Sequence, residues 1–416
     1  MVRRGAAISS QSCPLMNREM GSRRPADVEA DVELPASLLS ARVALVHDYL
    51  NQAGGAEKVV EIFAEMFPGA PIYTSVYDRE RMPDVWRRLD IRTSFMQRIT
   101  PRVGLAKALV PLYPTAFELF DLSTYDLVLS STTAFAKGVI TRPETCHVCY
   151  CNNPTRLVWM YHDYLRYERL PPGARSLLPW LTTPLRVWDY AAAQRVDYFV
   201  AGSFNAARRI AKYYRRESDV VQPAIDTTQF HPSDNVEDFF LVVSRLQPYK
   251  RIDLAVEACT RLGLPLRIVG SGPDQVRLQR MAGPSVRFLG RASDTEVQNL
   301  LARCRALLFP GEEDFGLTPL EAQASGRPVI AYGVGGVLET VIEGQTGQFF
   351  REPTVDALMD VLRNFDDRYD PAVLRRQAER FDKRVFKERL YGVLSRRYQE
   401  YRAGLGSGVH SAPAVG

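Results

Sequence analysis

Two glutamates with a glycine between them are the first residues whose types and spacing suit chemistry. Glu313 and Glu321 are separated by seven residues and follow an apolar run at 306–309, which predicts a buried strand. Thr318 is a good N-cap and would form a capping box with Glu321, so a helix is expected to begin there. A helix N-terminus at the carboxyl end of a parallel strand binds anions, and Gly316 lets backbone approach a ligand. Alternatively, Glu321 only caps its helix and Glu313 is one of several acidic loop residues.

Two cations follow another apolar run. Arg245 and Lys250 come after residues 239–243, which predict a strand. Cations at the carboxyl end of a parallel strand suit a diphosphate, because Arg presents a fork of donors and Lys a compact charge. The alternative is a solvated pair beside Arg251.

A pair of glycines opens the first expected helix. Gly54 and Gly55 stand between a strand expected at 42–47 and an amphipathic helix expected to end at Phe67. Such a junction is where phosphates are cradled, although the G-x-G-x-x-G spacing is not present. A structural turn and a ligand loop both remain open at this position.

Strands alternate with helices along most of the chain, which predicts parallel, doubly wound sheets. The chain has 416 residues, 46% hydrophobic and 24% charged, so it is globular and too long for one core. Further strands are expected at 71–76, 125–131, 147–151, 196–201 (the last of the first domain), 266–269, 286–289 and 328–332. The expected division is a disordered tail at 1–40, Rossmann-like domains at 41–217 and 218–384, a final helix at 385–403, and a disordered tail at 404–416.

This pattern resembles the retaining, nucleotide-sugar-dependent glycosyltransferases of the GT-B fold (glycosyltransferase family 4, group 1). The resemblance rests on the two motif glutamates, the two cations and the alternating second half, and it covers roughly residues 42–402. It implies an α/β fold of two doubly wound Rossmann-like domains that face each other across a cleft. It also implies that the helix at 385–403 crosses back onto the first, acceptor-side domain, while the second domain binds the donor.

The resemblance also assigns roles to individual residues. It implies that Glu313 holds the sugar hydroxyls, that Arg245 and Lys250 contact the phosphates, and that Glu321 binds the ribose. The remaining donor-binding positions that it implies are Gly54, Gly55, Gly270, Phe288, Leu289, Gly290, Phe315, Gly316 and Leu317.

One position departs from the subgroup that the chain resembles most, the bacterial polysaccharide mannosyltransferase-like enzymes. In that subgroup a strand of the first domain ends Tyr-Cys-His, and the histidine helps to hold the donor sugar. Here the strand ends Tyr150-Cys151-Asn152. An amide such as that of Asn152 can still hydrogen-bond a sugar hydroxyl, but it cannot carry charge, so a proton-handling role at this position is not expected.

The reaction implied is hexose transfer with retention of configuration, with mannose from GDP-mannose as the best match. The acceptor would be a glycan or a lipid-linked sugar in the synthesis of cell-surface polysaccharide such as lipopolysaccharide. Front-face attack would pass the acceptor's proton to the leaving phosphate, so no metal and no cofactor is expected. A fixed cation about 4 Å from that phosphate contributes up to ~4 kcal/mol at an effective dielectric near 20. The alternatives are a UDP-sugar donor, a sugar-nucleotide epimerase and an inactive GT-B scaffold.

Charge and apolar runs limit the other partners. The net charge of +5 suits an anionic ligand or membrane face and does not call for nucleic acid. No apolar run reaches 18 residues, and residues 1–40 have no apolar core of a secretory signal, so the expected location is the cytoplasm or the inner face of the plasma membrane. Residues 92–120 alternate basic and apolar side chains, which predicts peripheral contact with an anionic membrane or, alternatively, a solvated helix packed on the core.

Three cysteines lie close together in sequence. Cys146, Cys149 and Cys151 belong to an expected buried strand, on which Cys149 and Cys151 share a face. Zinc-like spacing is not present, so we expect reduced thiols and not a metal site.

Overall fold

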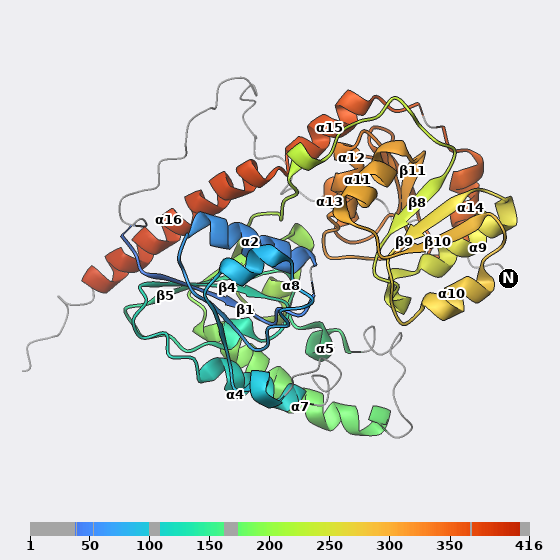
Figure 1. Ribbon diagram of the computed structural model, residues 1–416. Helices are drawn as coiled ribbons and strands as arrows, with labels where there is room; N and C mark the ends of the chain where they lie inside the picture. The colour runs from blue at the N-terminus through green and yellow to red at the C-terminus, as the bar shows by residue number, and fades with distance from the viewer. Residues whose placement is uncertain are drawn as a thin grey trace, which may run out of the picture. The chain divides into compact units, whose positions relative to one another are not determined.

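The computed structural model describes residues 38, 40–52, 54–99, 109–161, 174–366 and 368–407. In these residues the chain forms two parallel β-sheets, each accompanied by helices (Figure 1). Most of the tail expected at 1–40, and residues 408–416 of the tail expected at 404–416, lie outside the described residues.

The first sheet has seven strands in the order β3-β2-β1-β4-β5-β6-β7. Its strands are β1 (Val43–His47), β2 (Ile72–Thr74), β3 (Ile91–Thr93), β4 (Leu127–Thr132), β5 (Cys146–Cys151), β6 (Tyr198–Ala201) and β7 (Ser218–Val220). The central strands are buried along their whole length, as expected for a parallel sheet with both faces covered.

The second sheet has six strands in the order β10-β9-β8-β11-β12-β13. Its strands are β8 (Phe240–Val243), β9 (Leu266–Val269), β10 (Val286–Gly290), β11 (Ala306–Phe309), β12 (Val329–Tyr332) and β13 (Gly347–Phe350). Successive residues of β8 enter different hydrophobic clusters: Phe240 and Val242 pack in one, and Leu241 in the other. Both faces of the sheet are therefore covered, as a doubly wound fold requires.

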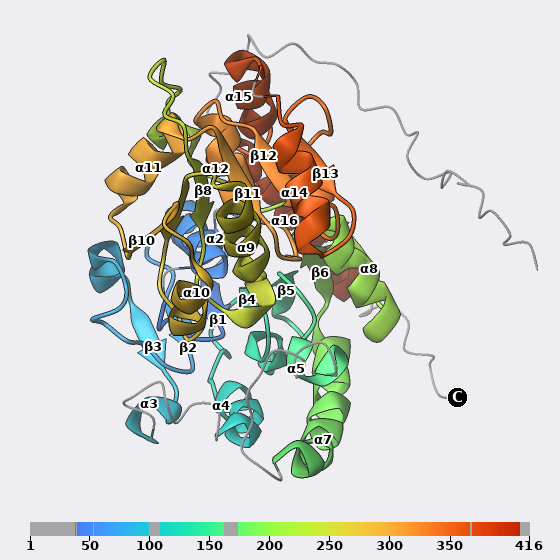
Figure 2. The same cartoon turned by 90° about the vertical axis from the view of Figure 1, so that its right-hand side faces the viewer.

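Helices connect the strands and cover the sheets (Figures 1 and 2). With the first sheet lie α2 (Gly55–Met66), α3 (Met96–Ile99), α4 (Tyr113–Glu118), α5 (Arg156–Trp159), α7 (Ala174–Arg195) and α8 (Phe204–Tyr213), and the short 3-10 helices η2 (Asp84–Arg88), η4 (Val110–Leu112) and η5 (Ala136–Gly138). After them come η6 (Thr227–Gln229), η7 (Pro248–Lys250), α9 (Ile252–Leu262), α10 (Gln275–Met281), α11 (Asp294–Arg303), α12 (Thr318–Ala324), α13 (Val337–Thr340), α14 (Val355–Arg363), α15 (Pro371–Glu379) and α16 (Lys383–Ser407).

The last helix, α16, packs on the first sheet's helices. Lys387 pairs with Glu65 of α2 at 2.7 Å, and the ring of Phe386 stacks on that of Phe63, with centroids 6.4 Å apart. The tail expected from residue 404 begins inside this helix, which continues to Ser407.

The expected end of the first sheet was wrong. β7 pairs with β6, as Phe199 opposite Ser218 shows, so β6 is not the last strand and the sheet extends past the boundary expected at 217. The reason is local: Ser-Asp-Val at 218–220 is a short edge strand without an apolar run. Ile-Arg-Thr in β3, the strand at the opposite edge of the sheet, is likewise short and has no apolar run.

The clustered cysteines all belong to β5 and are buried. Cys149 and Cys151 pack in one hydrophobic cluster, as the alternation predicts. Burial raises the pKa of the Cys149 thiol to about 12, so it stays protonated at neutral pH.

Candidate functional site

In both sheets the order in which strands are added reverses beside the strand that comes first in the sequence. In the first sheet this point lies between β1 and β4, and in the second between β8 and β11. Open α/β sheets bind ligands at the carboxyl ends of the strands beside such a point. Gly54 and Gly55 follow β1, Arg245 and Lys250 follow β8, and Glu313 follows β11. The topology therefore puts each of these predicted residues at a switch point.

Glu313 lies in the loop between β11 and α12, where its carboxylate forms an ion pair with Lys250. Both side chains are largely buried, with 24% and 13% of their surface exposed. The backbone holds the loop in place, because the Gly336 N–H donates to the Glu313 carbonyl at 2.8 Å. A Cβ on Gly336 would lie 2.2 Å from the Phe315 Cα, so a side chain does not fit there. Two residues predicted to contact different parts of a donor therefore contact each other.

The helix after this loop begins earlier than predicted. Leu317, the residue before α12, already has helical backbone angles and makes no side-chain cap bond. The capping box predicted between Thr318 and Glu321 is therefore wrong. The reason is Gly316, whose φ of +89° turns the chain one residue sooner and leaves Thr318 inside the first turn.

Glu321 does not form the predicted capping box, and its side chain pairs with a residue of a helix that lies with the first sheet. Its Oε1 accepts from the Lys58 Nζ of α2 at 3.0 Å. The Glu321 charge raises the pKa of Lys58. Glu321 is buried on its helix, and Lys58 is more than half exposed, so we assign the pair little stabilising energy.

The glycine loop is tied to β1 by a buried carboxylate. The Gly54 N–H donates to Glu57 Oε2 at 3.0 Å, and the other Glu57 oxygen lies 3.8 Å from His47 Nε2. A Cβ on Gly55 would lie 3.3 Å from Leu317 Cδ1. The loop after β1 therefore lies against the start of α12, as a shared phosphate site would require.

The two predicted cations point in different directions. Arg245 donates to Gln52 Oε1 at 2.6 Å, which links the loop after β8 to the loop after β1. Lys250 faces Glu313 instead. Arg245 is the more exposed of the two.

The residues predicted to flank the base lie at the ends of β9 and β10. Gly270 has a φ of +128°, and its N–H donates to the Gly290 carbonyl at 2.7 Å. A Cβ on Gly270 would lie 1.9 Å from the Ser244 oxygen, so only glycine fits. Leu289 is exposed, whereas Phe288 is partly buried and packs against the core.

Asn152 follows β5 and bonds within its own sheet. Its Nδ2 donates to Ser131 Oγ at 3.3 Å and to the Thr132 carbonyl at 3.4 Å. The next residue is the one that reaches the acidic loop: Asn153 Nδ2 donates to Asp314 Oδ1 at 3.2 Å.

Asp314, beside Glu313, is the residue that sequence reasoning passed over. Arg156 of α5 pairs with its Oδ2, and Arg209 of α8 donates to its Oδ1 at 2.5 Å. Burial opposes the charge of Arg156, but Asp314 outweighs it and the pKa of Arg156 is raised. Two features of the sequence could have indicated the partners of Asp314. They are the basic residues of the helix after Gly202-Ser203 and the proline turn before Arg156.

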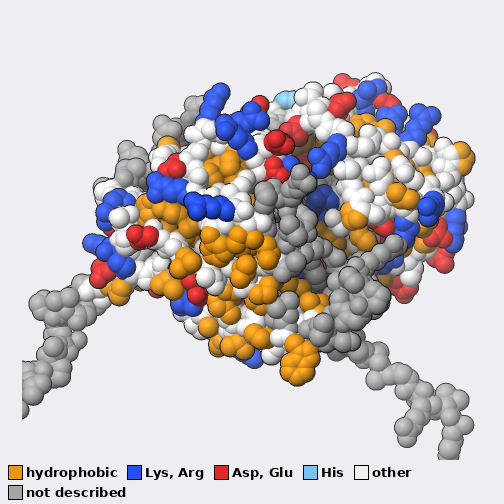
Figure 3. Space-filling view, turned by 60° about the horizontal axis from the view of Figure 1, so that its bottom comes forward, with side chains coloured by type: hydrophobic (Ala, Val, Ile, Leu, Met, Phe, Trp, Pro, Cys, Tyr) orange, Lys and Arg blue, Asp and Glu red, His pale blue; other side chains and the backbone are white. Residues whose placement is uncertain are grey.

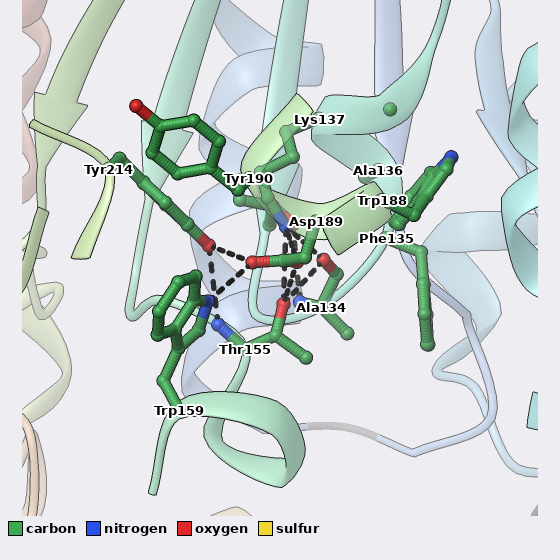
Figure 4. A network of polar contacts seen from close by, with 12 residues as sticks. Ala134, Phe135, Ala136, Lys137, Thr155, Trp159, Trp188, Asp189, Tyr190 and Tyr214 are labelled. Atoms are coloured by element: carbon green, nitrogen blue, oxygen red, sulfur yellow. Dashed lines mark hydrogen bonds and ion pairs between the residues drawn. The ribbon is translucent and has the colours of Figure 1, made fainter. Parts of the chain in front are cut away.

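The loop that carries Asn152, Asn153 and Arg156 is anchored by a buried charge network (Figure 4). Asp189 Oδ1 accepts from Lys137 Nζ at 2.5 Å and from Thr155 Oγ1 at 2.6 Å. Its Oδ2 accepts from Trp159 Nε1 at 2.7 Å and from the Tyr214 hydroxyl at 2.8 Å. The charged pair is almost fully buried, and all four Asp189 contacts are hydrogen bonds, so the network fixes the loop between η5, α7 and α8.

Comparison with known families gives a match in the second half of the chain. Residues 226–381 match the family described as "Glycosyl transferases group 1". A glycogen synthase from Mycobacterium tuberculosis is 37% identical over 150 residues, which cover 33% of this chain and 36% of the relative. A D-inositol 3-phosphate glycosyltransferase from Mycobacterium avium is 29% identical over 206 residues, 43% of this chain and 49% of the relative. The matched region thus spans about a third to a half of these curated relatives.

Solved structures share the fold over most of the chain. A sucrose-phosphate synthase from Thermosynechococcus elongatus superposes with a TM-score of 0.65 at 17% identity, over 87% of this chain and 99% of that one. The Anabaena protein HepE, solved with UDP and glucose, gives a TM-score of 0.63 at 17% identity, over 85% and 99%. The predicted GT-B fold of two Rossmann-like sheets is confirmed.

Over residues 226–381 the comparisons agree with the predicted family of group 1 glycosyltransferases, and the mannosyltransferase subgroup stays a prediction. Within the described residues, His, Cys, Asp and Glu do not gather in groups of three or more that could hold a metal ion. In the same part of the chain, no helix combines the length and hydropathy that crossing a membrane would need.

Proposed function

We propose that the whole chain is a retaining glycosyltransferase that moves a hexose from a nucleotide sugar to a glycan or lipid-linked acceptor. The observation that supports this most is the ion pair of Lys250 with Glu313 at the switch point of a sheet whose segment matches group 1 glycosyltransferases. We take GDP-mannose as the donor and cell-surface polysaccharide as the product, with a UDP-sugar as the competing donor.

Each residue has a role in this proposal. Arg245 and Lys250 neutralise the diphosphate as negative charge grows on it, and Glu313 accepts hydrogen bonds from the sugar hydroxyls. Lys250 exchanges its contact with Glu313 for one with phosphate when the donor binds. Glu321 accepts from the ribose hydroxyls, with Lys58 beside it.

The transfer step needs no base from the protein. The bond between C1 of the sugar and the diphosphate oxygen breaks, and the acceptor oxygen bonds to C1 on the same face. The acceptor's proton passes to the departing phosphate oxygen. The protein supplies fixed charge, orientation of the reactants and exclusion of water. In a site without water, fixed cations stabilise the negative charge of the transition state. Asn152 orients a sugar hydroxyl and handles no proton.

The test is a calorimetric and thermal-shift screen of the full chain against GDP, UDP, ADP and their common sugars. We expect stabilisation by GDP and GDP-mannose, followed by release of GDP from GDP-mannose in the presence of acceptor. If UDP-sugars alone stabilise the protein, the proposed GDP-mannose donor is wrong, and the proposed class of reaction still stands. Binding to none of these nucleotides would reject the transferase and favour an inactive scaffold.

A sugar-nucleotide epimerase makes a different prediction. It would release an altered nucleotide sugar or free sugar without any acceptor, which chromatography of the donor after incubation detects. We expect the donor's sugar to be unchanged in that control.

A further inference from the structure

The side chain of Glu339, on α13, reaches the first turn of α8. Its Oε2 accepts from the Phe204 N–H at 3.1 Å, and its Oε1 accepts from the Asn205 N–H at 3.2 Å. α13 follows β12 of the second sheet, and α8 follows β6 of the first sheet. One carboxylate therefore uses both of its oxygens to join helices that belong to different sheets.

The two amides that Glu339 binds need an acceptor from outside their own helix. The first four N–H groups of an α-helix have no acceptor within the helix. In α8 the N-cap residue Ser203 supplies one, because its Oγ accepts from the Ala206 N–H at 2.9 Å. Glu339 supplies the acceptors for the two amides before Ala206, and its negative charge is also favoured at the positive end of the helix dipole.

The chain crosses from the first sheet to the second next to this carboxylate. Gln222 lies in the segment between β7 and β8, and its Nε2 donates to Glu339 Oε2 at 3.3 Å. Glu339 is partly buried, and burial of a charge is costly unless the charge is hydrogen-bonded. These three donors belong to α8 and to the crossing segment, so the carboxylate keeps them when α13 lies against α8. We call this set of three hydrogen bonds the α8–α13 contact.

The same two helices hold the loop that carries Glu313. The N–H of Gly336, which precedes α13, donates to the Glu313 carbonyl at 2.8 Å. Arg209, on the second turn of α8, donates to Asp314 Oδ1 at 2.5 Å. The loop is thus held by backbone from the second sheet's side and by charge from the first sheet's side. Glu339 joins the two helices that provide these contacts.

A surface glutamate without a role is the alternative. Acidic and basic side chains are both scattered over the surface that Figure 3 shows, and exposed ion pairs contribute little to stability. Glu343, four residues after Glu339, belongs to such a pair, because it and its partner Arg351 are 49% and 62% exposed. Glu339 differs from it, since it is partly buried and bonds to backbone amides, which are fixed in position, in place of a flexible cation.

We propose that Glu339 is a positioning residue, which fixes α8 against α13 and thereby holds the loop of Glu313 where the transfer needs it. Its hydrogen bonds go to α8 and to Gln222, so it acts through Arg209 and its contact with Asp314 and does not act on the donor directly. The effect on transfer rests on the proposed function. The α8–α13 contact itself is a property of the fold, which can be measured without any substrate.

The first test is hydrogen exchange of the full chain, resolved to single amides by mass spectrometry with electron-transfer fragmentation. Glu339→Gln keeps the size of the side chain, removes its charge and replaces one acceptor oxygen with a donor. At least one of the Phe204 and Asn205 amides should therefore exchange about tenfold faster. The Ala206 amide, whose acceptor lies at the N-cap of α8, should keep its wild-type rate. Glu343→Gln is the matched control and should leave all three amides unchanged.

The second test separates binding from turnover. For Glu339→Gln we expect the affinity for GDP and UDP to stay within about threefold of wild type, because the Lys250–Glu313 pair lies within the second domain and is kept. The rate of nucleoside diphosphate release in the presence of acceptor should fall about tenfold, with a melting temperature close to that of the wild type. Adding Glu339→Gln to Arg209→Ala should lower this rate little further, because both changes act through one helix.

Each result decides one part of the proposal. Wild-type exchange at both the Phe204 and Asn205 amides would overturn the α8–α13 contact. Faster exchange at Ala206 as well would show that α8 itself unfolds, and it would overturn the positioning role. That role is also refuted by wild-type turnover of Glu339→Gln, or by effects of Glu339→Gln and Arg209→Ala that multiply. A wild type that neither binds nor turns over a nucleotide sugar would refute the proposed function, and the exchange rates would still decide the α8–α13 contact.

Discussion

Glu313→Gln removes one charge from the Lys250 pair and keeps the shape of the side chain. Two unit charges about 4 Å apart attract by about 4 kcal/mol at an effective dielectric near 20. Solvent and salt screen part of this, because 24% of Glu313 and 13% of Lys250 are exposed. If about a quarter remains, freeing Lys250 for phosphate contributes ~1 kcal/mol, so nucleoside diphosphate should bind about fivefold more tightly.

The same change should slow transfer. A hydrogen bond to a charged group contributes about 1.5–3 kcal/mol, which corresponds to a roughly tenfold to hundredfold fall in turnover if the sugar hydroxyls lose it at the transition state. The assay pairs calorimetric titration with GDP and UDP against the rate of nucleoside diphosphate release. Binding and turnover are therefore expected to move in opposite directions.

Glu312→Gln is the matched control, because this neighbour is half exposed and its ion pair with Arg209 is long, at 3.5 Å. We expect wild-type binding and turnover from it. Glu313→Gln with tenfold weaker nucleotide binding and normal turnover would refute the reasoning, because Glu313 would then serve the nucleotide and not the sugar.

Three further predictions follow from the packing of the site. Gly270→Ala, at φ +128° with the Ser244 oxygen 1.9 Å from the new Cβ, should abolish nucleotide binding, whereas Gly263→Ala, at φ +65° in open space, should cost about 1 kcal/mol in urea unfolding and leave binding intact. Arg209→Ala should lower turnover about tenfold through loss of the Asp314 contact, with Arg208→Ala, its exposed neighbour, as the unaffected control; equal effects of the two would exclude a role for Asp314. Asp189→Asn leaves the Lys137 charge buried without its partner and should cost about 3–5 kcal/mol, and adding Lys137→Met should recover part of it in the same unfolding measurement.

The central strands were predictable because a parallel strand buried on both faces reads as a continuous apolar run. Residues 306–309 and 266–269 are the bounds of β11 and β9, and the run at 239–243 contains β8. The edge strands of the first sheet give no such signal. Ser-Asp-Val in β7 and Ile-Arg-Thr in β3 are set by pairing with a neighbour, which sequence alone does not display.

The positions of the site loops in the topology could be predicted from the sequence, but the contacts of their side chains could not. Strand ends and glycines indicated where Glu313, Lys250 and Gly54 lie in the topology. The pairs they form depend on partners far apart in sequence, as with Lys58 and Glu321, which are 263 residues apart. The predicted start of α12 was wrong for another reason. The positive φ at Gly316 determines where the helix begins, and the capping preference of Thr318 does not.

Three consecutive carboxylates at 312–314 are an unexpected neighbour for an anionic donor. Cations from three elements pair with these carboxylates. Lys250 of η7 pairs with Glu313, Arg156 of α5 pairs with Asp314, and Arg209 of α8 pairs with both Asp314 and Glu312. Because two of these cations come from elements of the first sheet, the charge of the loop is balanced only when both sheets contribute. Loss of either arginine would leave extra negative charge next to the proposed diphosphate position, and repulsion of the donor would follow. We therefore expect the same ion pairs to couple donor affinity to the position of the acidic loop.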